Sequence, residues 1–389
     1  MRRSGGMVLL VLCCCASWGN VFGQTSFSQQ AMALERQGNW EAAIRSWQLA
    51  LKQNPRDLEA LSNVGMDEFR LGHYRAAASA YGKAAKLDPK AISLRMNLGV
   101  SLFKATQFKQ AAVVFAEMEK QQPGNERLTI LAGMSFYGAK EYAKAVPYLH
   151  AAANEQPKNV ALRLPLANSC LWAKQYQCVL TVYKQILALS GNSAQADMLA
   201  GEALSAEDQT AGAIEQFRDA VKANPDEPEV HFGLGYLLWT QGDYPEAEKE
   251  FRAELANDPT DAKSLTYLGD VLVHLHHPQQ ARKLLTQALR LDPSSELAYV
   301  DLGALDAAAG DKLLAVKDYK KAIAIDPKNT TPYWKLGRLE VSMGHRQEAK
   351  ADFAKLAKLH QEANQQLYLK MAGSPTARAA EAKTRQNHQ

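Results

Sequence analysis

The sequence lacks the motifs that enzymes commonly use. It contains no G-x-S-x-G nucleophile elbow, no H-E-x-x-H zinc-binding helix and no glycine-rich loop of the kind that holds phosphates. Its acidic pairs, such as Asp67 with Glu68, fall where a solvated helix surface explains them. We therefore expect no catalytic residues, no cofactor and no enzymatic activity.

Cysteine is scarce, which excludes a cysteine-based metal centre. The chain has five cysteines, three of them at residues 13–15, and none has CxxC or Cys/His ligand spacing. Cys170 and Cys178 are eight residues apart, so they can form a disulfide in an oxidising compartment. The alternative is that both are small core residues of a helical hairpin.

Positive and negative side chains nearly balance, with 45 lysines and arginines against 41 aspartates and glutamates. The formal net charge is +4, which gives no overall electrostatic reason to bind nucleic acid or an anionic membrane. Long runs of alternating β-branched residues are missing, whereas Ala, Leu, Lys, Gln and Glu are abundant. This composition favours helices over strands.

The first 23 residues have the pattern of a secretory signal peptide. Arg2 and Arg3 precede an apolar stretch at residues 7–18, which is too short to span a bilayer comfortably. Val21 and Gly23 place small residues at −3 and −1 of a cleavage site before Gln24. We expect a periplasmic or extracellular protein without a membrane span after cleavage, or a membrane-anchored one if the signal is retained. The cysteines at residues 13–15 suggest lipidation as a rival, but no small-residue lipobox precedes them.

A period of 34 residues runs through the rest of the chain. Prolines recur at this step, with Gly191 in the one missing slot: Pro55, Pro89, Pro123, Pro157, Pro225, Pro259, Pro293 and Pro327. A column of small residues keeps the same step: Gly65, Gly99, Gly133, Ala167, Gly201, Gly235, Gly269, Gly303 and Gly337. Further columns hold alanine and a large apolar residue, as at Ala111 and Phe115. So many agreeing columns identify a repeat protein. The predicted units are 24–57, 58–91, 92–125, 126–159, 160–193, 194–227, 228–261, 262–295, 296–329 and 330–363.

These columns resemble the tetratricopeptide-repeat family. The third unit shows the pattern in Leu98-Gly99, Ala111, Phe115 and Pro123. The resemblance implies an all-α, right-handed superhelical solenoid of about ten helix-turn-helix units.

The residues support this fold without the family name. Glycine at position 8 and alanine at position 20 of a unit let two helices approach closely, and proline at position 32 ends the second helix. Pairs such as Asp88-Pro89 fit a turn that also caps the next helix. Pro165 lies inside an expected first helix, where it should remove a hydrogen bond and kink the helix. Residues 364–372 are expected to extend the last helix as a cap, and residues 373–389 to form a disordered tail.

Positions 2, 5, 9, 12 and 13 of the first helices face away from the hairpin core. In proteins similar to this one, such positions line a concave groove for partner peptides. Here they carry many methionines and aromatic residues, which suit an adaptable binding surface. The alternative is that some of them pack between adjacent first helices. The predicted groove residues are Met66, Phe69, Met96, Phe103, Ile130, Met134, Tyr137, Trp172, Met198, Phe232, Tyr236 and Trp239.

A line of basic residues accompanies this face in the first units. Arg36, Arg70 and Lys104 follow the 34-residue step, and Arg127 adds to them. Such a line can attract an acidic peptide or an anionic polymer, although solvated surface charge explains it equally well.

The leading hypothesis is therefore an exported, non-catalytic scaffold that binds a peptide or an envelope protein in an apolar groove, with Trp239 and Trp172 as its main anchors. The alternatives are a polysaccharide-associated envelope component and a regulatory or scaffold subunit of a separately encoded enzyme such as a glycosyltransferase.

Overall fold

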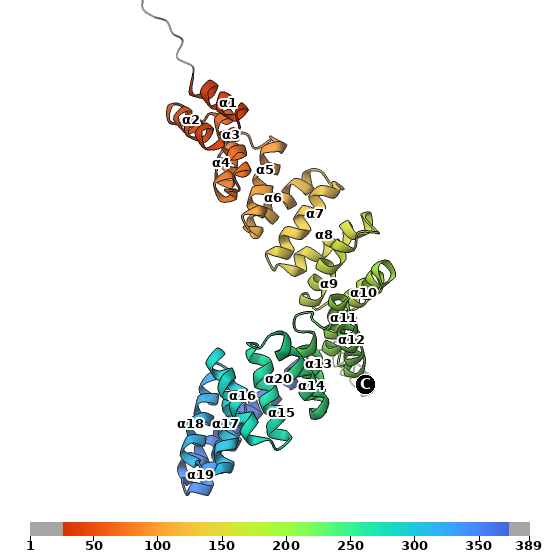
Figure 1. Ribbon diagram of the computed structural model, residues 1–389, viewed down its shortest axis with the longest axis vertical. Helices are drawn as coiled ribbons and strands as arrows, with labels where there is room; N and C mark the ends of the chain where they lie inside the picture. The colour runs from red at the N-terminus through yellow and green to blue at the C-terminus, as the bar shows by residue number, and fades with distance from the viewer. Residues whose placement is uncertain (1–25, 373–389) are drawn as a thin grey trace, which may run out of the picture. The chain divides into compact units, whose positions relative to one another are not determined.

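A computed structural model describes residues 26–372 of the chain, and the side chains of residues 26–366. The predicted signal peptide at residues 1–23 and the predicted tail at residues 373–389 lie outside the described residues. Between residues 26 and 372 the chain forms twenty α-helices and one 3-10 helix, with no strand (Figure 1). The predicted all-α fold of helical hairpins is confirmed.

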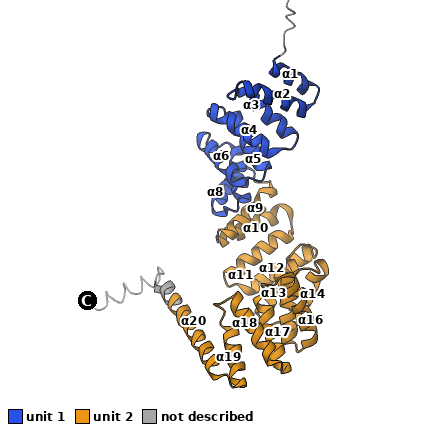
Figure 2. Cartoon of the chain, turned by 90° about the vertical axis from the view of Figure 1, so that its left-hand side faces the viewer, with its two compact units in different colours: residues 1–156 blue, residues 157–389 orange. Residues whose placement is uncertain are grey.

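The chain divides into two compact units (Figure 2). The first comprises residues 1–156 and contains four hairpins in its described part. Its helices are α1 (Phe27–Arg36), α2 (Trp40–Gln53), α3 (Leu58–Arg70), α4 (Tyr74–Leu87), α5 (Ile92–Lys104), α6 (Phe108–Gln121), α7 (Glu126–Gly138) and α8 (Tyr142–Glu155).

The second unit comprises residues 157–389 and contains six hairpins in its described part. Its last helix, α20, runs through residues 364–372. The elements are η1 (Val160–Leu162), α9 (Arg163–Trp172), α10 (Tyr176–Ser190), α11 (Ala194–Ala206), α12 (Thr210–Ala223), α13 (Val230–Thr240), α14 (Tyr244–Asn257), α15 (Ala262–His274), α16 (Pro278–Leu291), α17 (Glu296–Ala309), α18 (Lys312–Ile325), α19 (Thr331–Met343) and α20 (Arg346–Ala372).

The core of each hairpin is a contact between its two helices. In the third unit, a Cβ atom on Gly99 would lie 2.6 Å from the ring of Phe115, so only glycine fits there without a shift. Ala111, on the same face of the second helix, is fully buried. The small residues at repeat positions 8 and 20 therefore let the two helices approach closely, and the large apolar residue at position 24 packs directly against the glycine.

The turn between the two helices of a hairpin contains one residue with positive φ, at position 15 of every unit. Five of these residues are glycines and five are not, although a positive φ strains other residues. The set is Gly38, Gly72, Thr106, Lys140, Lys174, Asp208, Gly242, His276, Gly310 and Gly344.

In the turn between units, one polar side chain closes the turn and another caps the next helix. The side chain of Asp88, before Pro89, accepts a hydrogen bond from the backbone N–H of Lys90 at 3.1 Å, so it closes the turn itself. The next helix is capped two residues after the proline, as where Asp57 accepts from the N–H of Ala60 at 3.0 Å. The turn that begins at Asn54-Pro55 thus caps the next helix as expected, through Asp57, two residues after the proline.

Pro165 does not kink a helix, contrary to the expectation. The first turn of this unit is the 3-10 helix η1, and α9 begins at Arg163. Pro165 is therefore the third residue of α9, in the turn whose N–H groups have no helical partner. The chain accommodates the proline by starting the α-helix late. No helix among residues 26–372 is both long and apolar enough to cross a bilayer.

Candidate functional site

The seven predicted groove residues of the first unit are half-buried. Three of their aromatic rings pack against the first residue of the second helix in the same hairpin, five residues later. The pairs and their ring-centroid distances are Phe69–Tyr74 (5.2 Å), Phe103–Phe108 (5.2 Å) and Tyr137–Tyr142 (6.0 Å). Some of the apolar side chains on this face therefore pack within their own hairpins.

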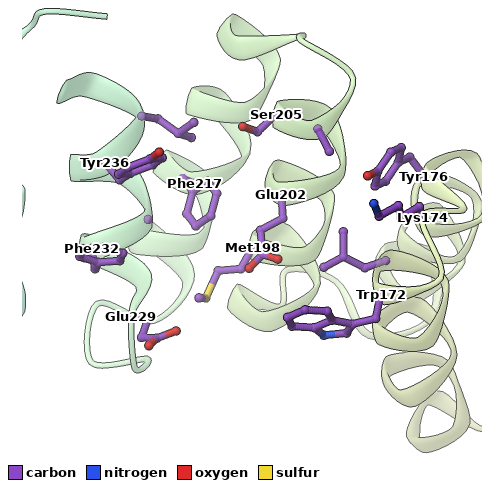
Figure 3. Close-up of a pocket in the computed structure, with 14 residues that line it drawn as sticks. Trp172, Lys174, Tyr176, Met198, Glu202, Ser205, Phe217, Glu229, Phe232 and Tyr236 are labelled. Atoms are coloured by element: carbon purple, nitrogen blue, oxygen red, sulfur yellow. The ribbon is translucent and has the colours of Figure 1, made fainter. Parts of the chain in front are cut away.

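In the second unit, four of the predicted residues surround one cavity of about 490 Å³, in the size range of ligand sites. We call it the α9–α13 pocket, because residues of α9 to α13 and their connections line it. Figure 3 shows Met198 and Glu202 of α11 between Trp172 on one side and Phe232 and Tyr236 of α13 on the other. Its lining residues are Leu171, Trp172, Lys174, Tyr176, Met198, Glu202, Ser205, Ala206, Phe217, Glu229, Phe232, Gly233, Tyr236 and Leu237.

A glycine outside the repeat columns shapes the floor of this pocket. A Cβ atom on Gly233 would lie 2.2 Å from the ring of Phe217, so no larger residue fits without displacing that ring. Phe217 of α12 is buried, and Gly233 opens the surface above it. The pocket therefore depends on close approach of α13 to α12.

Exposure separates the two tryptophans that were predicted as anchors. Trp172 is 64% exposed at the pocket wall. Trp239 is half-buried and does not line the pocket. Its indole N–H donates a hydrogen bond to the Asp270 carboxylate, and its ring lies 5.0 Å from that of Tyr267. Trp239 is thus held by contacts within the protein, and Trp172 offers the larger accessible surface.

Two aromatic residues connect the pocket to the core beneath it. The rings of Phe232 and Tyr236 lie 5.8 and 5.4 Å from that of Tyr267 on α15, which is half-buried. Phe232 also lies 5.9 Å from Phe251, which is fully buried. These contacts fix the orientation of the α13 wall.

Two carboxylates and one ammonium group provide the charges of the pocket. Glu202 is exposed at the pocket, and partial desolvation there, followed by the negative charge of Glu229, raises the pKa of its carboxyl above the usual value. Glu229 forms an ion pair with Lys263 of α15, with 3.5 Å between Oε1 and Nζ. Lys174 occupies the positive-φ position of its turn, at φ 58°.

A disulfide joins Cys170 of α9 to Cys178 of α10. The residues between them include Leu171, Trp172, Lys174 and Tyr176, all of which line the pocket. The disulfide therefore closes the turn that forms one wall of the pocket. Between residues 26 and 366, no three His, Cys, Asp or Glu side chains are grouped so as to hold a metal ion.

The predicted basic line lies entirely in the first unit. Arg36, Arg70, Lys104 and Arg127 are all exposed. The Arg70 guanidinium lies 4.2 Å from the centre of the Trp40 ring, so part of its charge faces an aromatic surface. A ligand for this line remains a prediction.

Sequence reasoning missed several residues of the pocket. Tyr176 and Phe217 belong to second helices, and Lys174 to a turn, so the selection of first-helix positions omitted them. Glu202 lies at position 9 of its unit, a groove position, but the search for apolar residues passed over it. Gly233 was the available signal, since it is a helical glycine outside the repeat columns.

Comparisons with known proteins agree with the repeat pattern. The sequence model described as "Tetratricopeptide repeat" matches residues 28–66, 63–126, 198–262 and 268–330, together more than half of the chain. A comparison with curated proteins found no significant match.

Among solved structures, the chain is similar to MamA. One crystal structure of MamA is 25% identical, with a TM-score of 0.37, over 42% of this chain and 96% of that one. The MamA fragment from residue 41 to its end from Desulfovibrio magneticus RS-1 is 20% identical, with a TM-score of 0.39, over 43% and 96%. Because the family pattern covers more than half of its length, the chain belongs to the tetratricopeptide repeat family, a family of protein-interaction scaffolds.

Proposed function

We propose that this chain is an exported scaffold that binds a peptide segment of an envelope protein in the α9–α13 pocket. The observation that carries the proposal is the pocket itself, a cavity of about 490 Å³ with aromatic walls on a protein-interaction scaffold. Trp172 and Tyr236, at the walls, are 64% and 38% exposed. Large exposed aromatic groups around a cavity are typical of binding sites.

The exposed ring of Trp172 is the expected main anchor. Covering it with a partner would remove a large apolar area from water, which is worth about 2–4 kcal/mol at usual transfer values. Trp239 is expected to act indirectly, since its N–H is bonded to Asp270 and its ring contacts Tyr236. It supports the α13 wall.

Binding is tested by affinity capture from envelope extract of the source organism, with partners identified by mass spectrometry. The baits are the wild-type chain, Trp172→Ala and Leu313→Ala. Leu313 on α18 is 78% exposed and does not line the pocket, so its variant controls for loss of an exposed apolar group. The proposal predicts a protein retained by the wild type and by Leu313→Ala and lost from Trp172→Ala.

Equal retention by all three baits would contradict the pocket as the binding site. Release of a polysaccharide by added salt, without any retained protein, would favour the alternative in which the basic line binds an anionic polymer.

Export is proposed from two independent features. The N-terminal 23 residues have the signal-peptide pattern, and the Cys170–Cys178 disulfide is of a kind that persists in oxidising compartments. Cell fractionation with N-terminal sequencing tests this. We expect a chain outside the cytoplasm that begins at Gln24, whereas an intact N-terminus in the cytoplasmic fraction would contradict export.

A further inference from the structure

The α9–α13 pocket combines aromatic walls with one carboxylate that has no counter-ion. Glu202 lies between Trp172 and the α13 wall (Figure 3). The Glu202 side chain is exposed, and the nearby carboxylate of Glu229 adds to the negative charge around it. A cation placed at Glu202 would therefore be attracted to a carboxylate that does not already pair with a cation among the described residues of the protein.

The other charged groups of the pocket do not fill this role. Among the side chains of residues 26–366, no Lys, Arg or His nitrogen forms an ion pair with Glu202, although Lys174 lines the same pocket. Glu229 has a partner, because the Lys263 ammonium is 3.5 Å from its Oε1. The unmatched negative charge is thus located on Glu202.

The aromatic walls also favour a cation. An ammonium or guanidinium group is attracted to the faces of aromatic rings, most strongly to tryptophan, and to a carboxylate. The protein already shows this preference at the edge of the pocket, where Lys263 Nζ lies 5.6 Å from the centre of the Phe232 ring. Trp172, which is 64% exposed, lines the same pocket as Glu202.

We propose that the occupant of the pocket is an extended peptide segment that places an apolar side chain against Trp172 and Phe232 and a lysine or arginine side chain at Glu202. This inference rests on the proposed function and adds the chemistry of the partner. A cavity of about 490 Å³ has room for two to three side chains of this size. An acidic segment is disfavoured, because it would bring a like charge towards Glu202 and Glu229.

The test is selection from a phage-displayed library of random dodecapeptides on the purified chain, in parallel with three variants. Glu202→Gln removes the charge at nearly constant shape, and Glu202→Lys reverses it. Glu215→Gln is the matched control, because Glu215 is an exposed carboxylate on α12 that does not line the pocket. One enriched peptide is then synthesised, and its affinity for each protein is measured by calorimetry at two salt concentrations.

The wild type and Glu215→Gln are expected to enrich apolar peptides with lysine or arginine at one fixed spacing from the apolar residue. Glu202→Gln should bind the synthetic peptide about 5- to 20-fold more weakly at low salt. Glu202→Lys should enrich aspartate or glutamate at that spacing. Far-UV circular dichroism checks that each variant remains helical.

The two proposals fail in different ways. Enrichment of apolar peptides without any basic preference, or an unchanged affinity of Glu202→Gln, would overturn the assignment of a cation to Glu202 and leave the peptide site standing. If the wild type enriched no peptide at all, the proposed peptide-binding function would fail, and this inference with it.

Discussion

Cys170 and Cys178 are joined by a disulfide across the turn between α9 and α10, with 5.9 Å between their Cα atoms. Cys170 is fully buried, and the chain between the two cysteines carries Trp172 and Lys174 to the pocket wall. A covalent link inside the hairpin thus fixes the residues that a ligand would touch. Stability and binding are expected to depend on the same bond.

Replacing both cysteines by alanine should lower the free energy of unfolding by about 2 kcal/mol, as expected for a disulfide that closes a short loop. It should also weaken peptide binding several-fold, because the α9–α10 turn gains freedom. Urea unfolding and calorimetry measure the two effects. Dithiothreitol should reproduce both in the wild type and change nothing in the double variant. Equal stability of wild type and double variant would contradict this role.

The two tryptophans of the second unit should respond differently to alanine. Trp239→Ala removes a half-buried ring and leaves the Asp270 carboxylate without its indole donor, so we expect a loss of about 3 kcal/mol in stability. Trp172→Ala removes a ring that is 64% exposed and should therefore cost clearly less stability than Trp239→Ala. Chemical unfolding monitored by circular dichroism distinguishes them, and a larger loss for Trp172→Ala would reverse the assignment.

The positive-φ turn position offers a stabilising substitution. Thr106 has φ 58°, a conformation that a β-branched residue rarely adopts. Thr106→Gly should raise the free energy of unfolding by about 0.5–1 kcal/mol, because glycine relieves this strain. Thr106→Ala, which keeps a Cβ atom, is the control and should gain less. A destabilised glycine variant would show that the turn is not strained at this residue.

A buried acid in the first unit should make stability depend on pH. Contrary to the expectation of a solvated helix surface, Asp67 is fully buried, and its burial, together with the nearby charge of Glu35, raises its pKa to about 7. The unfolded chain releases this proton near pH 4. The folded chain therefore binds more protons between these values, and its stability falls as the pH rises from about 4 to about 7.

Asp67→Asn should remove this loss. Relative to the wild type, the variant should gain stability on the order of 1–2 kcal/mol between pH 5 and pH 8. Urea titrations at both pH values measure the difference. Glu59→Gln, which changes an exposed carboxylate on the same helix α3, should show no such gain. A gain of equal size in both variants would exclude Asp67 as the titrating group.

Much of the fold could be predicted from the sequence, because the repeat pattern is clear even where single units depart from it. The glycine and aromatic columns predicted the close helix contacts that Gly99 and Phe115 make. Two local features required the structure. The positive φ of Lys174 could not be predicted from the sequence, because glycine occupies that turn position in only half of the units. The late start of α9 depends on how η1 absorbs Pro165.

The candidate site was less accessible to sequence reasoning. Helical periodicity places Trp172 and Tyr236 on the same face, but it does not show that Trp239 is bonded to Asp270 in the next hairpin. The charge at Glu202 becomes informative once its neighbours are known, since it lines the same pocket as Trp172 and Tyr236. Both features depend on contacts between successive hairpins. The packing geometry of those contacts cannot be predicted from a 34-residue period.

The most direct test of the account is the affinity of one selected peptide for the wild-type chain, Trp172→Ala and Leu313→Ala, measured by calorimetry under the same conditions. The account predicts that Trp172→Ala binds at least about tenfold more weakly, because Trp172 is the more exposed of the two exposed aromatic residues that line the α9–α13 pocket, Trp172 and Tyr236. Leu313→Ala should bind as the wild type does. Equal affinities for all three proteins would contradict the claim that this pocket holds the peptide.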